Sequence, residues 1–317
     1  MLFRCFKSVI GAMNWVLDHI PSKGEVLSLT CAILWAVAVL FFRKAVERVP
    51  AFKLNFLKNW FVFLLFLPTA FLLDVFSLPD ISTKEWGILF LSGFLGICMA
   101  DFLFFKALKI LGAGRNAIVD CSYSLFIILF SCLLLNETLG IIHFAGASLV
   151  VLGIVAVSME GESKEDGGGS YSLRGVVLGL SSMALTAIAV VLVKPLMEKE
   201  SISLVQVATL RLFAGIVGAT VILGALGKLR ETILTLRGDF PWLAFVVSGF
   251  IGGYVAMFIW LAGYKYTEAS IAGVLNQTST LFTVLLAAIF LKERLTLGKA
   301  VGSVLAFGGV AMIFLWA

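Results

Sequence analysis

The chain has 317 residues, of which 61% are hydrophobic and 14% are charged, with a formal net charge of +5. A soluble domain is roughly half apolar and a quarter charged, so the composition excludes an ordinary soluble protein and indicates a helical membrane protein. The positive charge is small and dispersed, which excludes the basic surface of a nucleic-acid-binding protein.

Residues 1–23 contain no apolar run long enough to cross a bilayer. Their apolar residues, from Leu2 to Ile20, recur at helical spacing with charged residues between them. This pattern predicts an N-terminal leader helix that lies in the membrane interface. Whether Met1 or Met13 is the true start stays open.

Ten apolar segments follow, and each approaches the roughly 20 residues that a spanning helix needs. They predict an all-α polytopic membrane protein with ten transmembrane helices, near 25–43, 54–74, 86–107, 113–135, 140–158, 175–195, 204–226, 240–263, 269–291 and 298–316. A charged, Gly-rich stretch at 160–174 is the expected linker between a first five-helix repeat (24–159) and a second (175–317).

The second half of the chain repeats the first. Ser92 and Gly93 recur as Ser248 and Gly249, at an offset of 156 residues that holds across three apolar segments. Such a duplication is typical of transporters. Because five is an odd number of crossings, the second copy enters the membrane upside down. We therefore expect two inverted repeats, a wet space between them, and both termini on one side.

Asp101 lies well inside the third predicted helix. A charge at that depth costs about 2.5–3.5 kcal/mol on insertion scales, so it must face protein or water and have a partner. Two interpretations follow: a carboxylate that binds substrate or coupling protons, or a structural ion pair.

The fourth helix of each half carries a polar stripe. In the first half the stripe surrounds Asp120, whose counterpart in the second half is Asn276. Either the two stripes line a central cavity or they bond to each other as interhelical contacts. The stripe residues are Asn116, Asp120, Tyr123, Ser124, Asn276, Gln277 and Thr280.

Two further pairs of charged residues, one pair basic and one pair acidic, occupy matching positions in the two halves of the sequence. Lys58 and Arg211 lie about a turn inside the second helix of each half. They could reach the interface, neutralise Asp101 or Asp120, or bind an anionic substrate. Glu137 and Glu293 close the fourth helix of each half and are interpreted as gate residues or, more simply, as groups that fix the following turn.

Other residue types give weaker signals. Scattered aromatic residues could stack a solute or belong to the lipid belt or core: Trp35, Trp60, Tyr123, Tyr254, Trp260 and Tyr264. The five cysteines and two histidines match no metal spacing, and no catalytic constellation or phosphate loop is recognisable. We expect no metal, no cofactor and no enzymatic activity.

Several motifs resemble the EamA-like family of the drug/metabolite transporter superfamily. They are Ala107-Leu108-Lys109, Asn136-Glu137-Thr138-Leu139 and Gly146 in the first half, and Gly263-Tyr264-Lys265, Lys292-Glu293-Arg294-Leu295 and Gly302 in the second. Ser124 and Thr280 depart from the proline that the family often has there. The resemblance implies cytoplasmic termini, whereas the positive-inside rule applied to the loops places the opposite side in the cytoplasm. Sidedness stays open.

These observations predict a secondary transporter in a cell membrane, either a plasma membrane or an inner membrane. Its expected partners are lipid and a small organic metabolite or xenobiotic. We expect it to export this solute and to couple the export to the proton gradient. One alternative is a sugar-phosphate or nucleotide-sugar exchanger of the same fold. Another, from a different class, is a membrane sensor or assembly protein that transports nothing. The sequence leaves the substrate and the oligomeric state, monomer or homodimer, open.

Overall fold

The computed structural model describes residues 23–135, 141–158, 172–267 and 269–316, and every regular element in these ranges is helical. The first half contains α2 (Lys23–Arg48), α3 (Ala51–Leu72), α4 (Thr83–Gly93), η1 (Phe94–Ala100), α5 (Asp101–Leu111), α6 (Ala113–Asp120), α7 (Ser122–Leu135) and α8 (Ile141–Ser158). The predicted leader, and all but the last residues of the predicted linker, lie outside the described residues.

The second half contains α9 (Leu173–Met197), α10 (Leu204–Ala225), α11 (Leu229–Leu234), η2 (Thr235–Arg237), α12 (Trp242–Ser248), η3 (Gly249–Ala256), α13 (Met257–Tyr266), α14 (Ala269–Gln277), α15 (Ser279–Phe290) and α16 (Leu297–Trp316). In both halves the third and fourth predicted helices consist of consecutive elements: α4-η1-α5 and α6-α7, then α12-η3-α13 and α14-α15.

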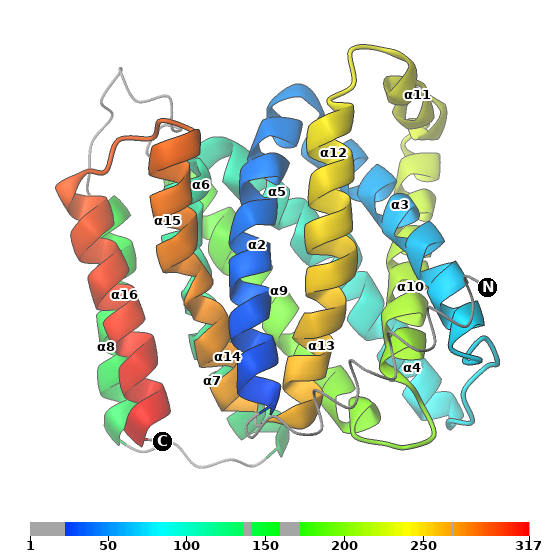
Figure 1. Ribbon diagram of the computed structural model, residues 1–317, viewed down its shortest axis with the longest axis horizontal. Helices are drawn as coiled ribbons and strands as arrows, with labels where there is room; N and C mark the ends of the chain where they lie inside the picture. Colours follow the sequence, from blue (N-terminus) through cyan, green and yellow to red (C-terminus); the bar gives the residue numbers. More distant parts are fainter. Residues whose placement is uncertain (1–22, 136–140, 159–171, 268, 317) are drawn as a thin grey trace, which may run out of the picture.

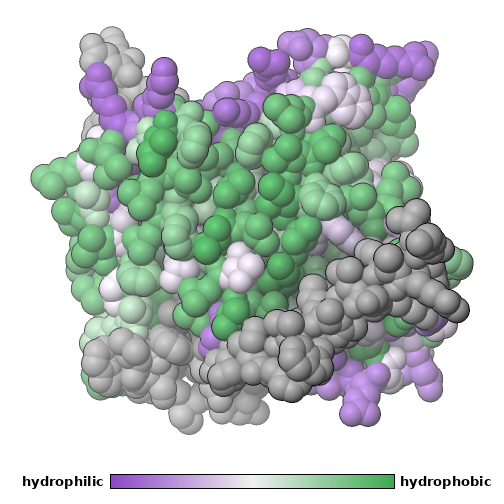
Figure 2. Space-filling model, in the orientation of Figure 1, coloured by the Kyte–Doolittle hydropathy of each residue, from purple (hydrophilic) through white to green (hydrophobic). Residues whose placement is uncertain are grey.

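Seven helices in the described ranges are long and apolar enough to cross a membrane. Three shorter apolar helices, Phe144–Gly153, Leu275–Phe290 and Leu297–Met312, lie at the fifth, ninth and tenth predicted segments. Large apolar side chains such as Leu64 (57% exposed) and Ile289 (67%) face outward. Figure 2 shows this apolar surface as a broad band with hydrophilic residues at its upper and lower rims. The predicted all-α membrane fold is confirmed, whereas the exact count of ten crossings stays a prediction.

The two halves are inverted relative to each other. α2 begins at the lower face in Figure 1, whereas α9, its counterpart, runs from the upper face to the lower. α16 also ends at the lower face, so the two ends of the described chain lie on one side. This arrangement agrees with the expectation from an odd number of helices per repeat.

Local sequence determines where two of the helices begin. Ser82 accepts a hydrogen bond from the Glu85 backbone N–H, and the Glu85 side chain accepts one from the Ser82 backbone N–H. Ser203 and Gln206 form the same reciprocal capping box before α10. Each box provides acceptors for backbone N–H groups that have no partner within the helix.

α8 and α16 form a pair at one edge of the molecule (Figure 1). Small residues bring their backbones together: a Cβ added to Gly153 would lie 2.7 Å from the Gly302 carbonyl oxygen, and one added to Gly309 would lie 2.5 Å from that of Gly146. The glycines of these helices therefore serve packing within the monomer. The remaining helices surround the centre of the molecule.

A π-helical segment interrupts the third helix of each half at equivalent positions: η1 in the first half and η3 in the second. A π-helix carries extra residues per turn and is found frequently at functional sites. In the first half Asn55, which is fully buried, donates hydrogen bonds to the carbonyl oxygens of Ile97 (2.9 Å) and Cys98 (3.1 Å). This amide stabilises η1 by pairing carbonyls in the irregular turn.

Candidate functional site

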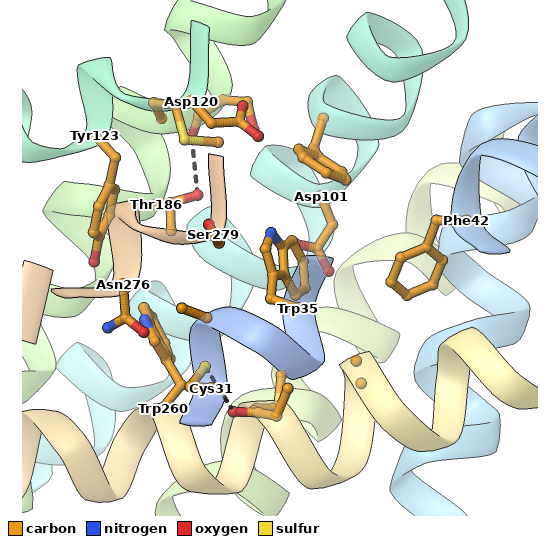
Figure 3. A pocket seen from close by; sticks show the side chains of 18 of the residues that line it. Cys31, Trp35, Phe42, Asp101, Asp120, Tyr123, Thr186, Trp260, Asn276 and Ser279 are labelled. Carbon is orange, nitrogen blue, oxygen red and sulfur yellow. Dashed lines mark hydrogen bonds between the residues drawn. The ribbon is translucent and has the colours of Figure 1, made fainter. Parts of the chain in front are cut away.

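A cavity of about 180 Å³ lies between the two halves. Its walls come from the first, third and fourth helices of both halves and from Lys58 on α3, and Figure 3 shows most of these side chains. The lining residues are Cys31, Ala32, Trp35, Phe42, Lys58, Asp101, Phe104, Phe105, Asp120, Tyr123, Ser182, Met183, Thr186, Gly252, Gly253, Ala256, Met257, Trp260, Asn276, Gln277 and Ser279. The surface of the cavity is mostly apolar and aromatic, with a few polar groups.

Asp101 and Lys58 form an ion pair at the cavity wall. The Lys58 Nζ lies 2.5 Å from Asp101 Oδ2, with side-chain exposures of 6% and 28%. The same ammonium also lies over the Phe105 ring, 5.4 Å from its centroid. One of the two roles expected for Asp101 was an ion pair, and Lys58 was a possible partner. The structure contains this ion pair.

Asp120 lines the cavity without a cationic partner. Both of its carboxylate oxygens accept hydrogen bonds from the Asn116 Nδ2, at 3.2 and 3.1 Å. Within the described part of the chain, no Lys or Arg nitrogen lies within the 4.0 Å of an ion pair. Among the described residues, the hydrogen-bond partner of the Asp120 side chain is therefore a neutral amide, that of Asn116.

The predicted polar stripes divide into two groups. Asp120, Tyr123, Asn276 and Gln277 line the cavity. Asn116, Ser124 and Thr280 do not, because they are buried behind the wall.

The stripe residues behind the wall make structural bonds. The Thr280 hydroxyl donates to the Ala117 carbonyl of the other half (2.9 Å), and the Ser124 hydroxyl donates to the Cys121 carbonyl (2.8 Å). Only the Thr280 bond joins two helices, because the Ser124 bond lies within the α6–α7 segment.

Arg211, in contrast, does not reach the cavity. It is 4% exposed, and a Cβ added to Gly96 in η1 would lie 3.2 Å from its Nη2. Among the described residues, its Nε has no hydrogen-bond partner. The reason is the position of α10, which packs against α3, α4 and η1 instead of lining the cavity. Lys58 therefore lines the cavity, whereas Arg211 lies behind the wall and interacts electrostatically with Asp101 and Tyr123, which do line it. A role of either cation in the pocket stays a prediction.

Glu293 joins the two halves. Its carboxylate accepts hydrogen bonds from the backbone N–H groups of Ala113 (2.9 Å) and Gly114 (3.2 Å), at the start of α6. Lys299 lies 3.3 Å from the same carboxylate, and both side chains are buried. Glu293 thus binds a helix of the opposite repeat besides lying at its own turn. Glu137 lies outside the described residues.

Three of the predicted aromatic residues line the cavity: Trp35, Tyr123 and Trp260. The Tyr123 hydroxyl lies 2.9 Å from that of Tyr264, which is fully buried. Trp60 faces outward at 40% exposure, and Tyr254 hydrogen-bonds Thr69. Sequence reasoning missed the contributions of Phe104, Phe105 and the small residues of α9, because apolar and hydroxyl residues are ordinary in membrane helices.

No cluster of three His, Cys, Asp or Glu side chains within the described ranges is placed to hold a metal ion. The arrangement is suited to enclosing a small, largely apolar solute, with polar groups to orient it.

Comparisons with known proteins agree with this geometry. The model of the EamA-like transporter family matches residues 22–159 and 173–315. An "Uncharacterized transporter" of Archaeoglobus fulgidus is 26% identical over 277 residues, 87% of this chain and 92% of the relative. Another, of Methanothermobacter thermautotrophicus, is 27% identical over 239 residues, 74% and 66% of the two chains.

Two further likenesses are more limited. "Crt homolog 2" of Dictyostelium discoideum is 37% identical over 74 residues, which is 23% of this chain and 15% of the relative. A solved crystal structure superposes with a TM-score of 0.64 over 94% of this chain and 98% of its own, at 20% identity, a likeness of fold. Because the family model matches both halves of the sequence, the chain is a multi-pass membrane transporter that belongs to the EamA-like transporter family.

Proposed function

We propose that the protein exports a small organic solute by alternating access, in exchange for protons. The observation that carries this proposal is the cavity between two inverted repeats, lined by both and containing two acidic side chains. A rocking movement of inverted repeats about a site near the bilayer midplane opens such a cavity to each side in turn.

Of the two acids, Asp120 is the better carrier of the coupling proton. Asp101 is already paired with the Lys58 ammonium, whose Nζ lies 2.5 Å from its Oδ2. Asp120, within the described ranges, has the Asn116 amide as its one hydrogen-bond partner. A carboxylate that lacks a fixed cation can alternate between a protonated and an ionised form as the cavity changes sides.

The alternatives fit the cavity less well. A sugar-phosphate exchanger needs several cations that converge on the phosphate, but Lys58 alone among the lining residues is cationic and it is bound to Asp101. A sensor or assembly protein that transports nothing predicts a dry core with its polar stripes bonded to each other. Asp120 and Gln277 instead line open space.

The test is transport into proteoliposomes of purified protein with an imposed pH step, screened across amino acids, purines, sugars and amines. Asp120→Asn is expected to abolish accumulation of the solute that is driven by the pH step. Asp239→Asn provides a matched control, because this acid is 91% exposed and pairs with Arg48 far from the cavity. Unchanged uphill transport by Asp120→Asn refutes the coupling role.

A further inference from the structure

The cavity contains two carboxylates in similar surroundings, but only one of them has an ammonium group. At Asp101 the Lys58 Nζ lies against the carboxylate and over the Phe105 ring at the same time. Asp120 lines the same aromatic cavity, with Trp35 and Trp260, and has no such cation among the described residues. Figure 3 shows Asp120, Trp35 and Trp260 around one space.

We propose that the solute is an organic monocation whose ammonium group binds between Asp120 and the tryptophan rings. This inference rests on the proposed transport function and names its substrate class. Indole faces attract cations more strongly than other aromatic faces do, and the attraction is stronger where water is excluded. The ionised Asp120 supplies the opposite charge, so the solute replaces the missing ammonium.

The rings are held in place for this role. Trp35 packs against Phe104 with centroids 5.6 Å apart, and Trp260 makes an edge contact with Tyr264 at 5.2 Å. Fixed rings lower the entropic cost of binding. The volume of about 180 Å³ is below the range of about 300–1,000 Å³ that holds drug-sized ligands, so the solute is small.

The charges around the cavity favour a cation over an anion or a zwitterion. Lys58 and Asp101 neutralise each other, which leaves Asp120 as the unpaired charge of the lining. Arg211 is buried outside the lining, near η1, where it interacts electrostatically with Asp101 and Tyr123. The other titratable side chains near Asp120 are its neighbour Cys121 and two residues of the cavity lining, Cys31 and Tyr123. Arg115 lies at the opposite end of α6, where Lys299 is bound to Glu293.

The proton and the solute use the same carboxylate, that of Asp120. Asp120 holds either a proton or the monocation, so the two compete for one site and cross the membrane in opposite directions. Exchange of one proton for one monovalent cation moves no net charge. Transport should therefore respond to a pH difference and not to the membrane potential.

Binding to purified full-length protein tests the inference, with quenching of tryptophan fluorescence as the readout. The probes are benzyltrimethylammonium, whose charge does not depend on pH, the neutral phenylacetamide and the anionic phenylacetate. We expect the cation to bind most tightly and its affinity to fall by about tenfold per pH unit once the solution is acidic enough to protonate Asp120. Asp120→Asn should weaken cation binding by at least about tenfold and remove its pH dependence, with phenylacetamide binding unchanged.

Asp120→Glu is the control for a merely structural effect of Asp120→Asn. It keeps a carboxyl group at this position, so it should bind the cation tightly and retain the pH dependence that Asp120→Asn lacks. In proteoliposomes, a potassium–valinomycin potential should leave cation exchange unchanged. Proton-driven movement of neutral or anionic solutes without cations, or transport that responds to the potential, overturns the inference and leaves the proposed transporter intact. A protein that moves no solute of any charge overturns both.

Discussion

At the scale of single residues, the two halves differ in chemistry although they share a fold. Lys58 and Arg211 are equivalent cations, but the acid that pairs with Lys58, Asp101, is replaced at the equivalent position of the second half by Met257. The first half thus keeps a paired charge at the cavity, whereas the second keeps a buried guanidinium whose Nε has no partner among the described residues.

The Lys58–Asp101 pair provides the first stability prediction. Asp101→Asn removes the negative partner and leaves a buried ammonium uncompensated, which typically costs about 3–5 kcal/mol. Replacing both residues, in Lys58→Met/Asp101→Asn, removes that uncompensated charge, so the double variant should unfold at a higher temperature than Asp101→Asn alone. The measurement is thermal unfolding in detergent of four purified proteins: the wild type, Lys58→Met, Asp101→Asn and the double variant. Their unfolding temperatures give the coupling between the two side chains. If the losses of stability in the two single variants add up to the loss in the double variant, Lys58 and Asp101 contribute no coupling energy to the stability of the protein.

The site could be predicted only in part at this scale. An acid inside an apolar helix has few acceptable environments, which is why Asp101 and Asp120 were identified from the sequence alone. Their partners depend on how helices pack across the bundle, and a hydrophobic pattern does not encode that packing. Lys58 and Arg211 looked alike in the sequence, yet one lines the cavity and the other lies behind it.

At the scale of elements, η1 and η3 set which side chains of the helices that follow them, α5 and α13, face the cavity. The residues after η1, Asp101, Phe104 and Phe105, line it, and so do Met257 and Trp260 after η3. An extra residue in a turn rotates everything that follows around the helix axis. These π-helical segments could not be predicted from the sequence, because Gly-rich apolar runs are equally compatible with a regular helix.

Asn55 is the residue on which η1 depends most directly. Asn55→Ala leaves the buried Cys98 carbonyl without its side-chain donor and the Ile97 carbonyl with only the longer bond from Asn59 (3.4 Å) among its side-chain donors in the described residues, at an expected cost of about 1–3 kcal/mol. We expect a lower unfolding temperature together with weaker solute binding, because the cavity face after η1 is displaced.

The matched control is Thr235→Ala, which removes an exposed side-chain bond to the Glu231 carbonyl within one helix and should change neither quantity. If Asn55→Ala lowers stability and leaves solute binding intact, η1 does not position the cavity wall.

At the scale of the whole molecule, the constant offset of 156 residues and the odd number of helices per repeat predicted the inverted arrangement. Those features follow from topology and need no knowledge of side-chain contacts. The contacts that hold the halves together needed the structure. Glu293 looked like a turn residue in the sequence, but its carboxylate caps the start of α6 in the other half.

The Glu293 contact closes the molecule at the face where α6 begins, and its loss should favour opening there. Glu293→Ala takes the acceptor from two buried N–H groups and leaves Lys299 with the Arg294 carbonyl as its remaining hydrogen-bond partner. Opening of this face should then become less costly, and a cysteine introduced at Asn276 should react faster with a water-soluble thiol reagent added from that side. The experiment uses a background in which the five native cysteines are replaced.

Glu198→Ala is the matched control for Glu293→Ala, because Glu198 pairs with Lys194 within its own helix region and its side chain is 54% exposed. Its removal should leave the labelling rate unchanged. If the Glu293 contact resists opening, its loss should increase the access of the reagent to the cavity from the α6 face only. The opposite face closes through different residues when inverted repeats alternate. Faster labelling from both faces would instead indicate general loosening of the fold, and unchanged labelling from the α6 face would show that Glu293 only fixes its turn.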